Sequence, residues 1–83
     1  MAYRLFVGGL PFSTTNEELE EFFAQHGKVS SARVITDRET QRSKGFGFVE
    51  FEDDAEGKAA EEKLNGAELG GRSLTVNQAR PQE

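Results

Sequence analysis

The segment GFGFVEF, residues 45–51, limits the possible folds of this chain more than any other stretch. As a β-strand it points alternate side chains to opposite faces of a sheet, with Val49 and Phe51 on one face and Phe46 and Phe48 on the other. Both faces of this strand are therefore apolar. The chain has 83 residues, enough for one small domain with a single core. The remaining elements decide which face is covered.

Turn residues, capping residues and apolar periodicity predict six elements. Thr15 with Glu18 is typical of a capping box, Asp53 is typical of an N-cap, and Gly27 lies where a C-terminal cap is expected. The strands are predicted at residues 3–9, 29–36, 45–51 and 73–77, and the helices at residues 16–26 and 53–64. The order β-α-β-β-α-β predicts an α+β, ferredoxin-like sandwich, in which two helices cover one face of a four-stranded antiparallel sheet.

The other face of this sheet has nothing in the chain to cover it. Alternation in the first strand makes Leu5 and Val7 core residues and turns Arg4 and Phe6 outward. With Phe46 and Phe48, three phenylalanines then lie on the open face. A second copy pairing the two sheet faces is one explanation, because exposed apolar patches mark interfaces. The other is a platform on which nucleic-acid bases stack.

Two motifs favour the platform. Residues 5–10 are LFVGGL, and residues 44–51 are KGFGFVEF, which matches the pattern K/R-G-F/Y-G/A-F-V-x-F/Y at every position. Over about residues 3–79 the chain resembles the RNA recognition motif family, in particular its glycine-rich, heteronuclear ribonucleoprotein and single-domain bacterial or cyanobacterial members. The resemblance implies the sheet order 4-1-3-2 and one domain over residues 1–83, with a core at 3–79 and a mobile tail at 80–83.

The resemblance also implies the roles of single residues. Phe6 and Phe48 would each stack under a base, Phe46 would lie against sugars or a second ring, and Lys44 would meet a phosphate. Phe51 would stay in the core. The ligand implied is single-stranded RNA, or single-stranded DNA on the same platform, because every base has a face that stacks.

Further residues are expected to contribute secondary contacts. The outward positions Arg33 and Ile35 lie on the second strand, Glu50 and Arg4 lie beside the aromatic residues, and Arg38 and Arg42 lie in the loop before Lys44. The segment Asn77, Gln78, Ala79 and Arg80 resembles one that recognises base edges. The alternatives are an ordinary solvent-facing arginine at 33, a solvated loop, and a frayed tail. Glu50 either accepts from a base amino group or discourages association between sheets.

The distribution of charge modifies this expectation. Formal net charge is −5, and the two predicted helices hold nine acidic and two basic residues, against six acidic and eight basic residues elsewhere. The acidity therefore lies on the helix layer, and the sheet side is mildly basic. We expect few phosphate contacts and a modest affinity that depends on stacking.

The sequence lacks the residues that other classes of function require. There is no cysteine and only one histidine, His26, so no disulfide, cofactor or metal site is expected, and no catalytic constellation is present. No apolar run is long enough to cross a membrane. We expect a monomeric, intracellular domain, cytoplasmic in a bacterium and nuclear or cytoplasmic in a eukaryote. The alternative function is a protein-interaction module that uses the aromatic face or the acidic face at Glu17, Glu18, Glu20 and Glu21.

Overall fold

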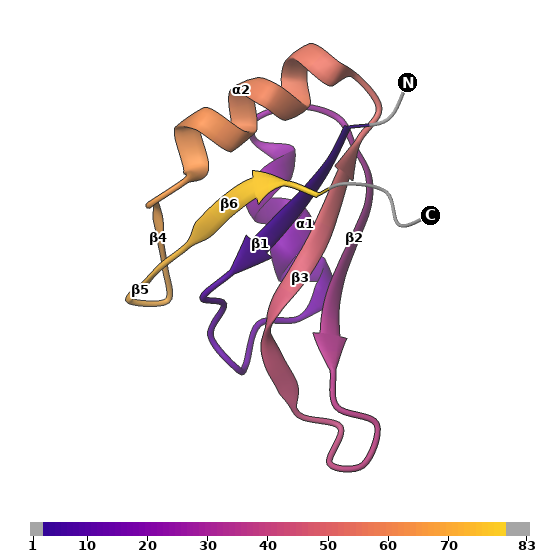
Figure 1. Ribbon diagram of the computed structural model, residues 1–83, viewed down its shortest axis with the longest axis vertical. Coiled ribbons are helices and arrows are strands. Elements are labelled where there is room, and N and C mark those ends of the chain that lie inside the picture. Colours follow the sequence, from indigo (N-terminus) through magenta and orange to yellow (C-terminus); the bar gives the residue numbers. More distant parts are fainter. Residues whose placement is uncertain (1–2, 80–83) are drawn as a thin grey trace.

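A computed structural model describes residues 3–79 of the chain, which form a main sheet with two helices packed on the same side (Figure 1). The main sheet has the order β2-β3-β1-β6, with every neighbouring pair antiparallel, and β4 and β5 form a separate two-stranded hairpin. The elements are β1 (Tyr3–Gly8), α1 (Asn16–Ala24), β2 (Val29–Thr36), β3 (Ser43–Phe51), α2 (Asp54–Leu64), β4 (Glu68–Leu69), β5 (Arg72–Ser73) and β6 (Thr75–Gln78). The predicted fold class and strand order are confirmed.

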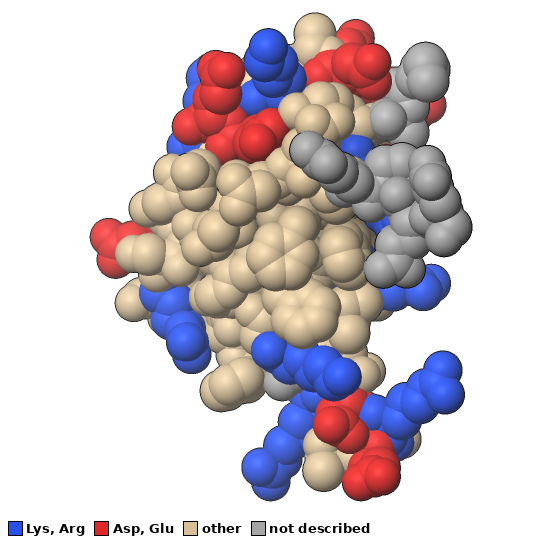
Figure 2. Space-filling view, viewed as in Figure 1, with Lys and Arg blue, Asp and Glu red and all other residues tan. Residues whose placement is uncertain are grey.

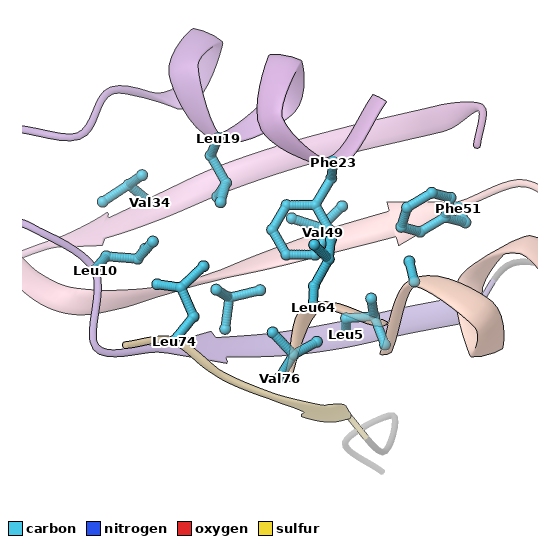
Figure 3. Packing of buried hydrophobic residues seen from close by; sticks show 12 residues of the cluster. Leu5, Leu10, Leu19, Phe23, Val34, Val49, Phe51, Leu64, Leu74 and Val76 are labelled. Atoms are coloured by element: carbon cyan, nitrogen blue, oxygen red, sulfur yellow. The ribbon is translucent and has the colours of Figure 1, made fainter. Parts of the chain in front are cut away.

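The core fills the space between the helices and one face of the sheet (Figure 3). Strands β1 and β3 contribute Leu5 and Phe51 among others, and α1 contributes Phe23, whose ring centroid lies 6.4 Å from that of Phe51. Helix α1 packs on β2 and β3, whereas α2 packs on β1, β3 and β6. The largest fully buried side chains are Leu5, Val7, Leu10, Leu19, Phe23, Val49, Phe51, Leu74 and Val76.

Both helices begin where the sequence predicts. The Thr15 side chain accepts from the backbone N–H of Glu18, and the Glu18 carboxylate accepts from that of Thr15, which completes the capping box. Asp53 caps α2 by accepting from Ala55 at 2.7 Å. Helix α1 ends earlier than predicted, with its C-cap at Gln25 rather than at Gly27.

The predicted last strand is interrupted at Leu74. The backbone N–H of Leu74 donates to Ala67 at 2.7 Å and its carbonyl accepts from Gly66 at 2.7 Å, so this residue pairs with the end of the α2 connection. Its side chain is buried in the core. The strand pairing of residues 73–77 therefore divides between β5 and β6, and only β6 joins the main sheet.

Strand β3 bulges at the end where it meets the β2–β3 loop. Val34 lies opposite Gly47, and Thr36 lies opposite Ser43. Over this stretch β3 therefore contains two more residues than β2. Gly45 lies inside the bulge with φ +83°, a left-handed conformation that favours glycine. Its carbonyl accepts from the backbone N–H of Leu10 at 2.8 Å. The bulge therefore joins the start of β3 to the loop that follows β1.

Candidate nucleic-acid interface

A row of four side chains crosses the open face of the sheet from edge to edge. Phe48 on β3 lies opposite Phe6 on β1 and Arg33 on β2, and Phe6 lies opposite Asn77 on β6. Directly opposed residues of antiparallel strands project to the same face. Because the neighbouring Leu5 is fully buried in the core, the row projects away from the helices. Residues from all four strands thus share one surface.

Three phenylalanine rings form the centre of this surface. The centroid of Phe6 lies 5.6 Å from that of Phe46 and 5.9 Å from that of Phe48, and the last two are 6.4 Å apart. All three rings are half-buried, because they pack against one another, whereas Phe51 on the same strand is fully buried. The predicted facing of β3 is confirmed. Phe6, Phe46 and Phe48 are called the aromatic platform below.

A hollow of about 460 Å³ lies beside the platform toward β2. The Arg4 guanidinium lies over the Phe48 ring, 5.1 Å from its centroid, at a distance typical of a cation–π contact. A ligand that stacks on Phe48 therefore has to share the ring with Arg4 or move it. Five predicted residues line this hollow, namely Arg4, Arg33, Ile35, Phe48 and Glu50.

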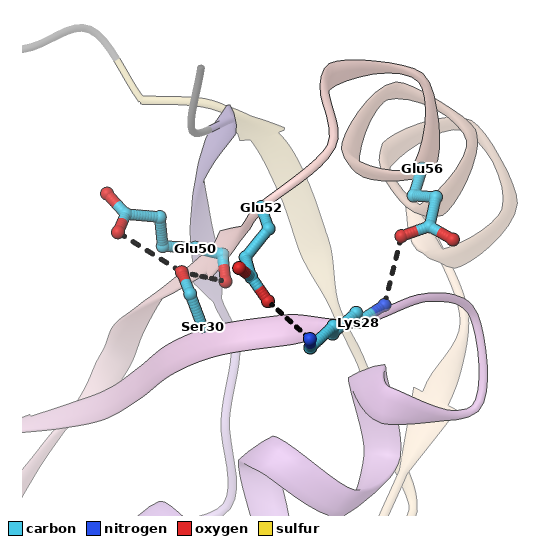
Figure 4. A network of polar contacts seen from close by, with 5 residues as sticks. All are labelled: Lys28, Ser30, Glu50, Glu52 and Glu56. Carbon is cyan, nitrogen blue, oxygen red and sulfur yellow. Dashed lines mark hydrogen bonds and ion pairs between the residues drawn. The ribbon is translucent and has the colours of Figure 1, made fainter.

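The Glu50 carboxylate accepts a hydrogen bond from a serine in a bulge of β2 (Figure 4). Ser30 is the extra residue of this bulge, and its hydroxyl donates to the Glu50 carbonyl at 3.1 Å and to Glu50 Oε1 at 3.2 Å. Nearby, Lys28 Nζ pairs with Glu52 at 3.3 Å, an exposed ion pair that contributes little stability. The backbone N–H of Lys28 donates to Glu56 and so links α2 to the start of β2.

The C-terminal segment divides between the two sides of the sheet. Asn77 faces the platform, whereas Gln78 lies opposite the inward-facing Leu5 and its side chain therefore projects on the helix side. The backbone N–H of Ala79 donates to the Arg4 carbonyl at 2.8 Å and continues the pairing with β1. Arg80, the last predicted contact residue, lies outside the described residues, as do the other tail residues 81–83.

Glu61 on α2 anchors this end of the sheet. Its Oε2 accepts from the backbone N–H of Gln78 at 3.2 Å, and its Oε1 accepts from the Tyr3 hydroxyl at 2.7 Å. The pKa of Tyr3 is raised to about 12, mainly by the hydrogen bond to Glu61 and secondly by burial. Tyr3, which has the same strand parity as the core residues Leu5 and Val7, is thus a packing residue, and one carboxylate joins α2 to both β1 and β6.

The loop residues expected to contact RNA lie beyond the other end of the platform. Arg38, Arg42 and Lys44 are exposed. Arg42 lines a separate cavity with Phe12, Ser13 and Gln41. This cavity and the hollow around Glu50 share no lining residue.

Three residues near the interface receive no role from the sequence patterns. Phe12 is a large hydrophobic side chain that is 67% exposed, and Arg72 lies over its ring at 5.6 Å from the centroid. Glu61 is the third, because its contacts connect separate elements. A phenylalanine between proline and serine is the only sequence signal for Phe12, and it does not distinguish an exposed ring from a buried one.

Charge surrounds this face rather than covering it. Figure 2 shows an uncharged centre over β1 and β3, blue side chains around the margin, and red side chains mainly over α2 and at the tip of the β2–β3 loop. On α1 the four glutamates of the predicted acidic face are all exposed, namely Glu17, Glu18, Glu20 and Glu21. The predicted separation of charge between the helices and the sheet face is thus visible in the structure.

Residues 3–79 lack the features of a metal site and of a membrane span. That part of the chain contains no group of three or more histidine, aspartate or glutamate residues placed to hold a metal ion. Neither of its helices is long and apolar enough to cross a membrane.

Comparison with known proteins assigns the fold and the motifs to one family. The RNA recognition motif model matches residues 5–75, and the chain belongs to this family. A glycine-rich, abscisic acid-inducible RNA-binding protein of Zea mays is 56% identical over 77 residues, which are 93% of this chain and 49% of the relative. The chain therefore spans about half the length of the curated relatives it matches.

Solved structures agree with this assignment. The crystal structure of the RNA-binding protein PG1 is 48% identical with a TM-score of 0.90, and the alignment covers 96% of this chain and 99% of that one. The Sxl-lethal protein/RNA complex is 32% identical with a TM-score of 0.89, over 96% of this chain and 48% of that one.

Proposed function

We propose that this chain is a single-stranded RNA-binding domain that stacks bases on the aromatic platform. The observation that carries the proposal is the presence of three phenylalanine rings in mutual contact on a sheet face that no element of the described chain covers. Stacking on aromatic side chains contributes about 1–3 kcal/mol per base and tolerates any base. The family and the RNA-binding relatives support the same ligand.

Each platform ring has a role in this proposal. Phe6 and Phe48 each stack under one base, and Phe46 lies against sugars or a further ring. Phe48 and Arg4 together present an aromatic face and a cation, a combination suited to a nucleotide because the base stacks and the phosphate is anionic.

The surrounding polar residues give positioning and selectivity. Arg33, Ile35 and Glu50 border the hollow beside Phe48, where a stacked base presents its edge. Glu50 accepts hydrogen bonds from a base amino group there, and Ser30 holds the carboxylate in place. Lys44 and Arg42 contact phosphates, and Asn77 with the backbone of residues 78–80 contacts base edges on the β6 side.

The remaining parts of the proposal concern the chain as a whole. Residues 1–83 form one binding domain that acts without catalysis or a cofactor, as a monomer inside the cell. Single-stranded DNA binds the same platform more weakly where a 2′-hydroxyl contact contributes.

Fluorescence anisotropy with two RNAs tests this function. We expect micromolar binding to a labelled, randomised single-stranded hexamer and much weaker binding to a mixed-sequence RNA duplex of about 12 base pairs, because duplex bases are stacked on one another. The logarithm of the affinity should fall with the logarithm of salt concentration with a slope of magnitude about 1.4–2.1, as expected for two or three phosphate contacts on a single strand. Equal binding to the duplex, or a much steeper slope, would contradict a stacking mechanism.

A further inference from the structure

Phe12 is an exposed aromatic residue outside the platform, in the loop between β1 and α1. Its side chain is 67% exposed, although phenylalanine is among the residues most often buried. The platform residues do not need it for packing, and it is not part of the core cluster. An exposed ring of this kind is available to a ligand.

The ring stands next to the end of the platform. A Cβ placed on Gly45 would lie 3.6 Å from Phe12 Cε1, so the ring packs against the bulge at the start of β3. Phe46 is the next residue of that strand and faces the open surface. The hydrogen bond from Leu10 N–H to the Gly45 carbonyl ties the loop to the same point. An RNA strand that leaves the platform past Phe46 therefore reaches Phe12.

A cavity of about 670 Å³ opens on one side of the ring and is lined by Phe12, Ser13, Gln41 and Arg42. This volume lies within the range of about 300–1,000 Å³ found for small-ligand sites. The cavity is therefore large enough for a nucleobase.

The far wall of the cavity is a hydrogen-bonded turn over residues 37–42. The Gln41 N–H donates to the Asp37 carbonyl at 2.7 Å, and the Asp37 N–H donates to the Arg42 carbonyl at 2.8 Å. The Asp37 carboxylate accepts from the N–H groups of Glu39 and Thr40, which lowers the pKa of Asp37. The wall is thus held in position before a ligand arrives.

Arg72 lies over the ring, 5.6 Å from the Phe12 centroid, and Arg42 lines the cavity beside it, and these two cations indicate the chemistry of the ligand. The carboxylate of Asp37, also on the turn, is already occupied by backbone N–H groups. An aromatic ring with two cations at the same site matches a nucleotide, whose base stacks while its phosphates are anionic. An apolar peptide side chain would offer no anionic group to either guanidinium.

We infer that Phe12, together with Gln41, Arg42 and Arg72, forms a further base-stacking subsite that takes a nucleotide continuing past Phe46. This inference rests on the proposed function, because it extends the path of the same RNA. It gives the chain a binding site longer than the sheet alone provides.

Paired oligonucleotide lengths test the subsite. We expect Phe12→Ala to weaken binding of a randomised single-stranded octamer by about 5- to 150-fold, as for the loss of one stacked base. Binding of a trinucleotide, which the sheet accommodates, should stay as in the parent protein. The thermal midpoint of Phe12→Ala should also be unchanged, because the ring is exposed. Phe48→Ala is the matched control and should weaken both lengths.

Two conservative variants separate stacking from simple apolar contact. Phe12→Leu keeps an apolar side chain and should bind the octamer as weakly as Phe12→Ala, whereas Phe12→Trp should bind it at least as well as the parent. The chain has no tryptophan, so Phe12→Trp introduces a single fluorophore, and the octamer should quench it.

The outcomes distinguish this subsite from the function on which it rests. Parent-like octamer binding by Phe12→Ala or by Phe12→Leu overturns the subsite and leaves the platform intact. Absence of octamer quenching in Phe12→Trp does the same, and so does quenching by protein concentration alone, which indicates contact between two copies. Failure of the parent protein to bind either RNA overturns the proposed function, and the subsite with it.

Discussion

Replacing Phe51 with alanine is expected to lower the free energy of unfolding by about 3–5 kcal/mol. Phe51 is 0% exposed and packs against Phe23 of α1, so truncation removes a large buried ring and leaves a cavity at the junction of helix and sheet. A domain of this size has a total stability near the lower end of about 5–15 kcal/mol. The variant should therefore be close to unfolding at room temperature.

Urea denaturation followed by circular dichroism measures this loss. Parent and variant should share the same slope against urea and differ in midpoint, because the loss acts on the folded state. A Phe51→Ala protein that unfolds at the parent's midpoint would contradict the assignment of this face of β3 to the core.

Replacing Phe48 with alanine is expected to weaken RNA binding strongly and to lower the free energy of unfolding only a little. The ring lies half-buried on the open face, against the other platform rings and Arg4, so its loss should reduce stability far less than the loss of the fully buried Phe51. Binding of single-stranded RNA should weaken by about 1–3 kcal/mol, the contribution of one stacked base. Anisotropy with the randomised hexamer and a urea curve on the same sample measure both quantities.

Phe48 and Phe51 form a matched pair for this comparison. They are the same residue type on the same strand, three positions apart, and they project from opposite faces. Phe48→Ala binding RNA as the parent does, or unfolding as readily as Phe51→Ala, would show that the ring serves the core rather than a ligand.

Most of the fold follows from local patterns in the sequence. Alternation along β3 separates Phe48 from Phe51 because strand geometry fixes which side chains share a face, and the covered face is then decided by where the helices are. Thr15 and Asp53 identify the helix starts because capping acts within one turn. The platform follows from the same parity, since Phe6 and Phe48 lie directly opposite each other.

The features that sequence reasoning missed depend on contacts between distant segments. Leu74 leaves the sheet because residues 66 and 67 offer it hydrogen bonds, and no pattern within residues 73–77 contains that information. Gln78 has its side chain on the helix side because of its register with Leu5. Phe12 lies against Gly45, 33 positions further along the chain, and Glu61 joins α2 to Tyr3 across 58 positions.

A backbone-amide NMR titration with a single-stranded RNA hexamer of randomised sequence tests the central claim most directly. If the open sheet face is the RNA-binding surface, shift changes should concentrate at residues 4–9, 33–35, 44–50 and 77–79, while amides on the outer sides of α1 and α2 stay in place. A folded protein whose shifts stay unchanged at millimolar RNA, or change mainly on the acidic helices, would contradict it.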